Sequence, residues 1–214
     1  MNLHAPDLPV VYIVDDDPAV RDALGLLLRS VGIATRCFAD PDAFLAQYDA
    51  RPGCLLLDIR MPHVSGLAFH ENLVGQGIAI GVIFITGHGD VMQCRRAFKA
   101  GAADFLMKPI DETVLIESVQ KAIAASLARH GEARLRADFG ARLATLTGRE
   151  REVMHMLMDG VTNKEAAYAL DISLRTVESH RARIFEKLAV ASLADCVRQY
   201  LQVGQAGRES EAST

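Results

Sequence analysis

The stretch Cys54-Leu55-Leu56-Leu57-Asp58 decides the fold that we predict for this chain. Its four apolar residues stand between Pro52-Gly53 and Pro62, a pattern typical of a short, fully buried strand. Asp58 lies where that strand emerges. Because ligands of open α/β sheets bind outside the carboxyl ends of the strands, Asp58 is a candidate site residue.

The composition is that of an ordinary globular protein. The chain has 214 residues, a net charge of -4 and 50% hydrophobic residues, enough for one large or two small domains. Residues 1–9, an N-terminal extension, lack the basic and apolar parts of a signal peptide, and no apolar run is long enough to span a membrane. The four cysteines are far apart, which favours a reducing cytoplasm.

Charge is distributed unevenly along the chain. Residues 1–128 contain ten Lys and Arg against fifteen Asp and Glu, whereas residues 141–203 contain nine against eight. An acidic first part and a nearly neutral second part indicate two domains with different partners.

Five strand patterns alternate with helix patterns in the first part. The strands are Val10–Val14, Ile33–Phe38, Cys54–Asp58, Ile78–Ile85 and Asp104–Met107. This alternation predicts an α/β fold, a doubly wound five-stranded parallel sheet with helices on both faces. The polar residues at the strand ends, Asp15, Asp16, Asp58, Thr86 and Lys108, then lie at one edge of the sheet.

The residue types at this edge suit phosphoryl chemistry. Three crowded carboxylates repel one another unless a cation neutralises them, and their hard oxygen ligands suit Mg²⁺. A lysine and a hydroxyl beside that ion complete a seat for a phosphoryl group. One carboxylate would serve as nucleophile, and the metal and the lysine would stabilise the charge.

Residues 10–128 resemble a bacterial two-component receiver domain. The segments DDDP, LLLDIRMP, ITGHGD and LMKP carry the resemblance, in this order and at the right strand ends. It implies that Asp58 is the phosphoacceptor. It also implies Mg²⁺, or Mn²⁺, on Asp15, Asp16, Asp58 and the backbone carbonyl of Arg60.

The resemblance also implies a switch. Thr86 would supply the switch hydroxyl, Lys108 the charge partner and Phe105 the switch aromatic. Because Phe105 has no hydroxyl, the switch would work by packing alone. Phosphorylation would remodel the helix over residues 90–100 and the strand and helix that follow, and so promote a homodimer.

Residues 129–142 are predicted to form a helical linker. An apolar stripe with a spacing of four residues continues through it, and Gly131 weakens the helix without necessarily breaking it. The sequence is compatible with one long helix or with two helical pieces that meet at a hinge at Gly131.

The second domain, residues 143–203, is predicted to be all-α with four helices. Thr147 and Thr162 each precede a glutamate by three residues, which is a capping box, and Ser173 caps a further helix. The predicted helices cover residues 148–158, 163–170, 174–188 and 193–202. The middle pair, joined by a tight turn, has helix-turn-helix geometry. Residues 204–214 are predicted to be a disordered tail.

This domain resembles the LuxR-type helix-turn-helix DNA-binding domain. The resemblance implies that the helix over residues 174–188 enters the major groove of double-stranded DNA. Glu178, Ser179 and Arg181 would read bases, and Thr176, His180, Lys187, Asn163 and Lys164 would contact phosphates. Arg175 and Arg183 lie on the same outward face.

Two other functional classes compete with a regulator. A haloacid-dehalogenase-like phosphohydrolase also uses a strand-end aspartate, Mg²⁺ and lysine, but it needs a second aspartate two residues later, where this chain has Arg60. A phosphate-relay module with a protein-binding tail would not need basic residues on one helix face. The sequence has no P-loop, no HExxH and no dinucleotide-binding glycine motif.

The predicted protein is a response regulator of the FixJ/NarL type. Its partners would be a sensor histidine kinase, promoter DNA, a second copy of the chain and RNA polymerase. It would not be an enzyme in the ordinary sense, although a receiver can catalyse its own phosphorylation and dephosphorylation.

Overall fold

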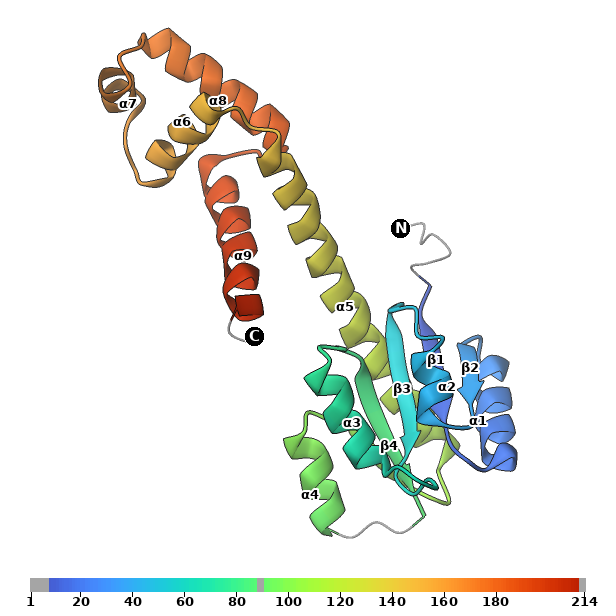
Figure 1. Cartoon of the computed structure of the whole chain (residues 1–214). Helices are drawn as coiled ribbons and strands as arrows, with labels where there is room; N and C mark the ends of the chain where they lie inside the picture. Colours follow the sequence, from blue (N-terminus) through green and yellow to red (C-terminus); the bar gives the residue numbers. More distant parts are fainter. Residues whose placement is uncertain (1–7, 88–90, 212–214) are drawn as a thin grey trace. The chain divides into compact units, whose positions relative to one another are not determined.

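The structure, a computed structural model, describes residues 8–87 and 91–211 and divides the chain into two compact units. The N-terminal unit comprises residues 1–130 and the C-terminal unit residues 131–214. Figure 1 shows the elements of both units in the order of the sequence. Asp90, the first residue of one predicted helix, lies outside the described residues.

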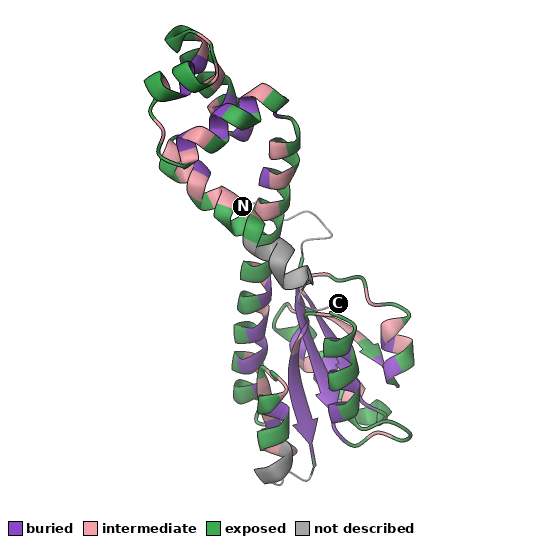
Figure 2. Cartoon of the chain, turned by 60° about the vertical axis from the view of Figure 1, so that its left-hand side comes forward, coloured by how far each residue is buried: buried purple, intermediate pink, exposed green. Residues whose placement is uncertain are grey.

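The N-terminal unit is built on the predicted five-stranded parallel sheet. The strands are β1 (Val10–Val14), β2 (Ala34–Phe38), β3 (Gly53–Asp58), β4 (Gly81–Thr86) and β5 (Asp104–Met107). Their order is β2-β1-β3-β4-β5, and every neighbouring pair is parallel. The strands β1, β3 and β4 are almost entirely buried, as their purple colour in Figure 2 shows. This sheet confirms the predicted fold class.

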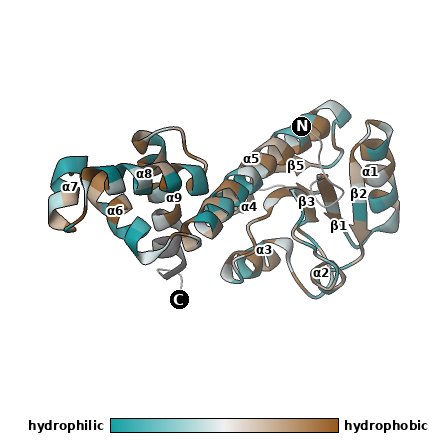
Figure 3. Cartoon of the chain, turned by 90° about the horizontal axis from the view of Figure 1, so that it is seen from above, coloured by the Kyte–Doolittle hydropathy of each residue, from teal (hydrophilic) through white to brown (hydrophobic). Residues whose placement is uncertain are grey.

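Alternate residues of the strands contribute to two separate cores, one on each face of the sheet. Tyr12, Leu55 and Phe84 face a core that includes residues of α2 (Pro41–Leu45), α3 (Gly66–Gly75) and α4 (Val91–Lys99). The neighbouring strand residues face a core with α1 (Pro18–Ser30) and the first turns of α5 (Glu112–Ala144). Figure 3 shows β1 and β3 as mainly hydrophobic.

Two helices of this unit begin with an aspartate cap followed by a proline. Asp17 is the N-cap of α1 and accepts a hydrogen bond from the backbone N–H of Ala19, with Pro18 at the first helical position. Asp40 caps α2 in the same way. The helix α2 is short and ends at Leu45.

The predicted linker is part of a single helix. The helix α5 runs without a break from Glu112 to Ala144, through Gly131, so the structure favours the first of the two alternatives. Phe139, in the predicted linker, is 2% exposed and belongs to the core of the C-terminal unit. Arg142 donates a hydrogen bond to the carbonyl of Leu188 in the same unit.

The C-terminal unit contains the predicted helices α6 (Gly148–Met158), α7 (Asn163–Ala169), α8 (Leu174–Leu188) and α9 (Leu193–Glu211). The side chains of Thr147 and Thr162 and the glutamates three residues later form both predicted capping boxes. Ser173 caps α8 by accepting from the backbone N–H of Thr176.

The last helix differs from the prediction. The helix α9 continues past Val203 to Glu211, so most of the predicted disordered tail is helical. Glutamine, alanine and glutamate in this segment are good helix formers, and two glycines cost only about 1 kcal/mol each. Within the described residues, no helix is long and apolar enough to cross a membrane.

Candidate functional site

The acidic residues at the carboxyl edge of the sheet are held by two neighbouring strands. The strand β3 ends at Asp58, and Asp15 directly follows β1. The two strands pair in parallel, which brings both residues to the same edge. Asp58 is 5% exposed and Asp15 is 2% exposed, so both carboxylates are largely removed from water.

Lys108 joins the two acids. It follows β5, and its Nζ lies 2.8 Å from Oδ2 of Asp15 and 2.9 Å from Oδ1 of Asp58. Burial raises the pKa of Asp58 above its usual value, although the bond to Lys108 opposes this shift. Burial lowers the pKa of Lys108, but its bonds to the two carboxylates outweigh this effect and raise the pKa overall. One ammonium thus serves two buried acids.

Backbone N–H groups hold the remaining oxygens of both carboxylates. The N–H of Arg60 donates to Oδ2 of Asp58 over 2.6 Å, and the N–H of Asp17 donates to Oδ1 of Asp15 over 2.9 Å. These bonds fix each carboxylate in the loop that follows its strand. The structure therefore brings Asp15, Asp58 and Lys108 together, as the sequence predicts.

Asp16 does not join this cluster. It is exposed, and within the described part of the chain no three Asp, Glu, His or Cys side chains form a group that could hold a metal ion. The donor set nevertheless suits a hard divalent cation, because two carboxylates converge and a third stands on the next residue of the chain. A cation bound there would compete with Lys108 for Asp15.

The two predicted switch residues lie on adjacent strands. Thr86 ends β4 and is fully buried, and its carbonyl accepts a hydrogen bond from the backbone N–H of Lys108 over 2.8 Å. Phe105 pairs with Phe84 in the register of β4 and β5, and it is half-buried against the core that contains Ala97 of α4. Thr86 therefore lies beside the acidic edge, and Phe105 on the neighbouring strand packs against the core to which α4 contributes.

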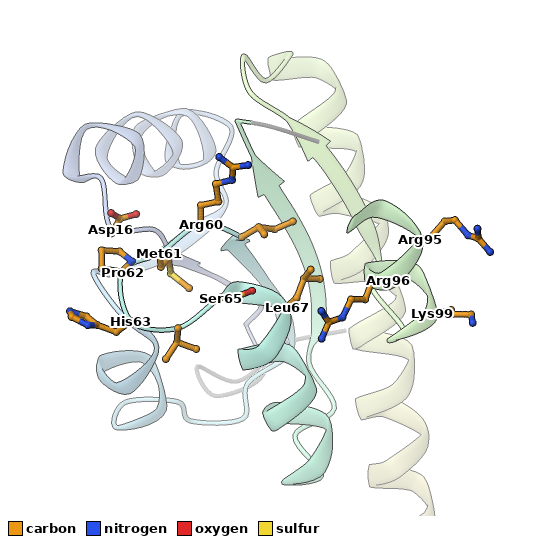
Figure 4. Close-up of a pocket in the computed structure, with 12 residues that line it drawn as sticks. Asp16, Arg60, Met61, Pro62, His63, Ser65, Leu67, Arg95, Arg96 and Lys99 are labelled. Carbon is orange, nitrogen blue, oxygen red and sulfur yellow. The ribbon is translucent and has the colours of Figure 1, made fainter. Parts of the chain in front are cut away.

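A groove of about 1070 Å³ lies beside the acidic edge, between the loop after β3 and α4. Apolar side chains, among them Met61, Val64 and Leu67, line it together with Asp16 and basic residues. In Figure 4, Arg96 extends from α4 toward Leu67, whereas Arg95 and Lys99 point away from the loop. The groove gives the acidic edge an open approach on the side of Asp16.

The helix α8 presents the predicted basic face to the surface. Val177, Ile184 and Leu188 are fully buried in the core of the unit. The residues on the remaining face are exposed or half-exposed: Arg175, Thr176, Glu178, Ser179, His180, Arg181 and Arg183. The guanidinium of Arg181 stacks on the ring of Phe185, with its carbon 5.3 Å from the ring centroid. Asn163 and Lys164 begin α7 and are also accessible.

Two of the predicted phosphate contacts already have partners within the chain. Nζ of Lys187 lies 2.6 Å from Oε2 of Glu150, a glutamate that is 3% exposed. The hydroxyl of Thr176 lies 2.8 Å from that of Ser173. We therefore assign Lys187 a structural bond that the sequence did not reveal, because Glu150 is 37 residues away.

Two family patterns match the chain. Residues 11–120 match the response regulator receiver domain, and residues 144–200 match the bacterial regulatory proteins of the luxR family. The receiver match favours a phosphorylated regulator over a phosphohydrolase. The luxR match favours DNA over protein as the ligand of the helical unit.

Relatives match almost the whole chain. The transcriptional regulatory protein FixJ of Azorhizobium caulinodans is 40% identical over 98% of this chain and 100% of its own length. FixJ of Rhizobium meliloti is 44% identical over 91% of this chain and 96% of its own. The solved structure of the response regulator StyR matches with a TM-score of 0.82 and 37% identity, over 91% of this chain and 98% of that one.

Both domains and their order are therefore shared with complete regulators. A receiver implies a kinase as partner, and a LuxR-type domain implies binding to DNA. The chain belongs to the FixJ-type response regulators, which are two-component transcription regulators rather than classical enzymes.

Proposed function

We propose that Asp58 is the residue at which this regulator is phosphorylated by a histidine kinase. The observation that carries the proposal is the single ammonium of Lys108, which lies within hydrogen-bond distance of both buried carboxylates, Asp15 and Asp58. Such a shared cation can stabilise new negative charge at Asp58.

In the proposed reaction, one carboxylate oxygen of Asp58 attacks the phosphorus of a phosphohistidine. The P–N bond breaks, the imidazole nitrogen leaves and takes a proton, and an acyl phosphate remains on Asp58. Lys108 stays as the charge partner of the phosphoryl group. The chain itself supplies these groups, so it catalyses its own phosphorylation and, with water, its own dephosphorylation.

A divalent cation completes the proposed site. Receivers generally bind Mg²⁺ at acidic residues, and we assign Mg²⁺, or Mn²⁺, to Asp15, Asp16, Asp58 and the backbone carbonyl of Arg60. The ion supplies charge neutralisation for the phosphoryl oxygens. Asp16, which is exposed, is the ligand that has to turn toward the site.

The signal then leaves the site through Thr86 and Phe105. We propose that Thr86 moves to the phosphoryl oxygens and that Phe105 turns into the vacated space. Exposed apolar residues on α4, β5 and α5 support dimerisation through these elements: Phe98 is 51% exposed, Met107 57% and Val114 48%. Burial of such side chains against a second copy would be favourable.

The dimer would bind promoter DNA through two copies of α8. Glu178, Ser179 and Arg181 are accessible and would read bases, and Asn163, Lys164 and His180 would contact phosphates. The nearly neutral charge of this domain predicts weak binding by one copy, so two copies are needed. RNA polymerase is the next partner, and the four free cysteines support a cytoplasmic location.

The test is phosphorylation of the full chain by acetyl phosphate, with and without Mg²⁺, in the wild type and in Asp58→Asn. We expect incorporation that needs both Mg²⁺ and Asp58, with a shift from monomer to dimer in light scattering. Incorporation that is unchanged in Asp58→Asn would overturn the assignment. Phosphorylation without dimerisation would overturn the proposed output step alone.

A further inference from the structure

Arg21 reaches back from α1 to the acidic loop. It stands in the first turns of α1, where its backbone N–H bonds to the carbonyl of Asp17 over 3.1 Å. Its side chain donates from Nη1 to the backbone carbonyl of Asp15 over 2.6 Å. Side chains of a helix point toward its N-terminus, which makes this contact sterically natural.

The position of this arginine is unfavourable for the helix itself. The first turns carry the positive end of the helix dipole, where a cation is unfavourable. No acidic residue stands in the first turn of α1 to offset that charge. The compensation comes from the hydrogen bond to Asp15 and from the carboxylates of Asp15, Asp16 and Asp17 just before the helix.

The bond from Arg21 completes the fixation of Asp15. The carboxylate of Asp15 is held by the N–H of Asp17 and by Lys108, and its carbonyl is held by Arg21. That carbonyl belongs to the peptide group that links Asp15 to Asp16. When the plane of this peptide group is fixed, the direction of the backbone from Asp15 to Asp16 is fixed as well.

We propose that Arg21 is a positioning residue for the cation site, which holds the Asp15–Asp16 peptide in the orientation that lets both acids serve one ion. This inference rests on the proposed function for the presence of that ion. Groups that orient the ligands of a metal ion without contacting the ion typically change metal affinity by 10-fold or more when they are removed.

The experiment compares Mg²⁺ binding to the full-length wild type, Arg21→Ala, Arg21→Gln and Arg29→Ala by calorimetry. Arg29 is the matched control, because it lies on the same helix but donates to the hydroxyl of Thr35, on β2. We expect Arg21→Ala to bind Mg²⁺ about 10-fold more weakly. Arg21→Gln, which keeps a neutral donor, should retain most of the affinity, and Arg29→Ala all of it.

Equal or tighter binding in Arg21→Ala would overturn the inference, because the guanidinium would then act only as a charge that repels the ion. Equal loss in Arg21→Ala and Arg21→Gln would also contradict positioning through the hydrogen bond.

A second readout needs no metal. Amide exchange of Asp17, whose N–H bonds to Asp15, should be faster in Arg21→Ala and unchanged in Arg29→Ala. If the wild type binds no Mg²⁺, the proposed cation site fails. The exchange rate of Asp17 still decides whether Arg21 orders the acidic loop, and an unchanged rate would show that it does not.

Discussion

Asp58 and Glu150 are two buried carboxylates with opposite properties. Asp58 is 5% exposed and lies 2.9 Å from Lys108, and Glu150 is 3% exposed and lies 2.6 Å from Lys187. Yet burial raises the pKa of Asp58, whereas the bonds from Lys187 and Thr147 lower the pKa of Glu150 to about 2. The folded protein therefore disfavours one charged acid and favours the other.

The difference lies in how the hydrogen bonds are shared. Asp58 has to share Lys108 with the neighbouring carboxylate of Asp15. The charged oxygen of Glu150 receives Lys187 together with the N–H and the hydroxyl of Thr147. A shared cation leaves an acid that gains from a further positive ion. A full set of donors makes an acid that stabilises the fold and has no capacity for chemistry.

The largest effect is expected for Glu150→Gln. The neutral amide loses the ion pair with Lys187, although its oxygen can still accept from the backbone N–H of Thr147 in the capping box. The C-terminal unit should therefore lose about 2 kcal/mol of unfolding free energy. We place this value below that of a fully buried pair because the side chain of Lys187 is 35% exposed. Amide exchange in α6 and α8 of the full chain measures it.

Glu152→Gln is the matched control for this change. Glu152 lies on the same helix and pairs with Arg149 at the surface, with its side chain 57% exposed. We expect its replacement to cost about 0.5 kcal/mol or less. Equal effects of the two variants would remove the distinction between Glu150 and an ordinary surface acid.

The opposite sign is expected for Asp58→Asn. A group with a raised pKa contributes its stability below its unfolded pKa and loses it as the pH rises through the folded pKa. At neutral pH the charged Asp58 thus weakens the N-terminal unit, and the neutral amide should stabilise it by about 1 kcal/mol.

Amide exchange in β1 and β3, compared with that of the exposed control Asp22→Asn, checks this sign. Mg²⁺ should stabilise the wild type and so reduce the difference in stability between the wild type and Asp58→Asn. If Asp58→Asn were less stable than the wild type, the ion pair between Asp58 and Lys108 would stabilise its unit, as the ion pair between Glu150 and Lys187 does.

The proximity of Asp15, Asp58 and Lys108 could be predicted from the sequence because it follows from the topology of the sheet. Asp15, Asp58 and Lys108 each follow a strand, and parallel strands with ends at one edge bring them together without knowledge of any contact. The capping box of Glu150 was visible because both members lie within four residues. Its ion pair with Lys187 was not, because no local pattern links residues of α6 and α8.

The failures have equally physical causes. The segment after Val203 contains glycine and serine, which are poor helix formers. A helix that has already started adds residues at little cost, however, so α9 continues to Glu211. Arg21 was not recognised as part of the site because the local pattern showed only a helix. The feature of the sequence that points to such a role is a cation near the positive end of a helix, where it is unfavourable unless it has a partner.

The smallest expected effect on stability is that of His70→Leu. This substitution removes another titrating group from the N-terminal unit, so the pH dependence that remains there can be compared more directly with that of Glu150. His70 is 3% exposed, and its ring packs edge-on against Phe84 with 5.5 Å between centroids. Its buried Nδ1 has no hydrogen-bond partner among the described residues. Burial lowers the pKa of His70, although Glu71 opposes the shift.

Because the pKa of His70 is lower in the folded state, the unfolded chain binds the proton at a higher pH than the folded chain does. Stability is then complete above about pH 6.5 and declines as the pH falls toward the lowered pKa, by no more than about 0.8 kcal/mol at pH 6. His70→Leu should remove this decline in amide exchange measured at pH 7 and pH 6, and His63→Leu, at an exposed histidine, should not. The acid sensitivity of Glu150 begins only below about pH 4.5, so the contribution of His70 should be lost before that of Glu150. If Glu150→Gln changed the response of α6 and α8 to pH between pH 7 and pH 6, the donors around Glu150 would not hold its pKa down as the contrast with Asp58 requires.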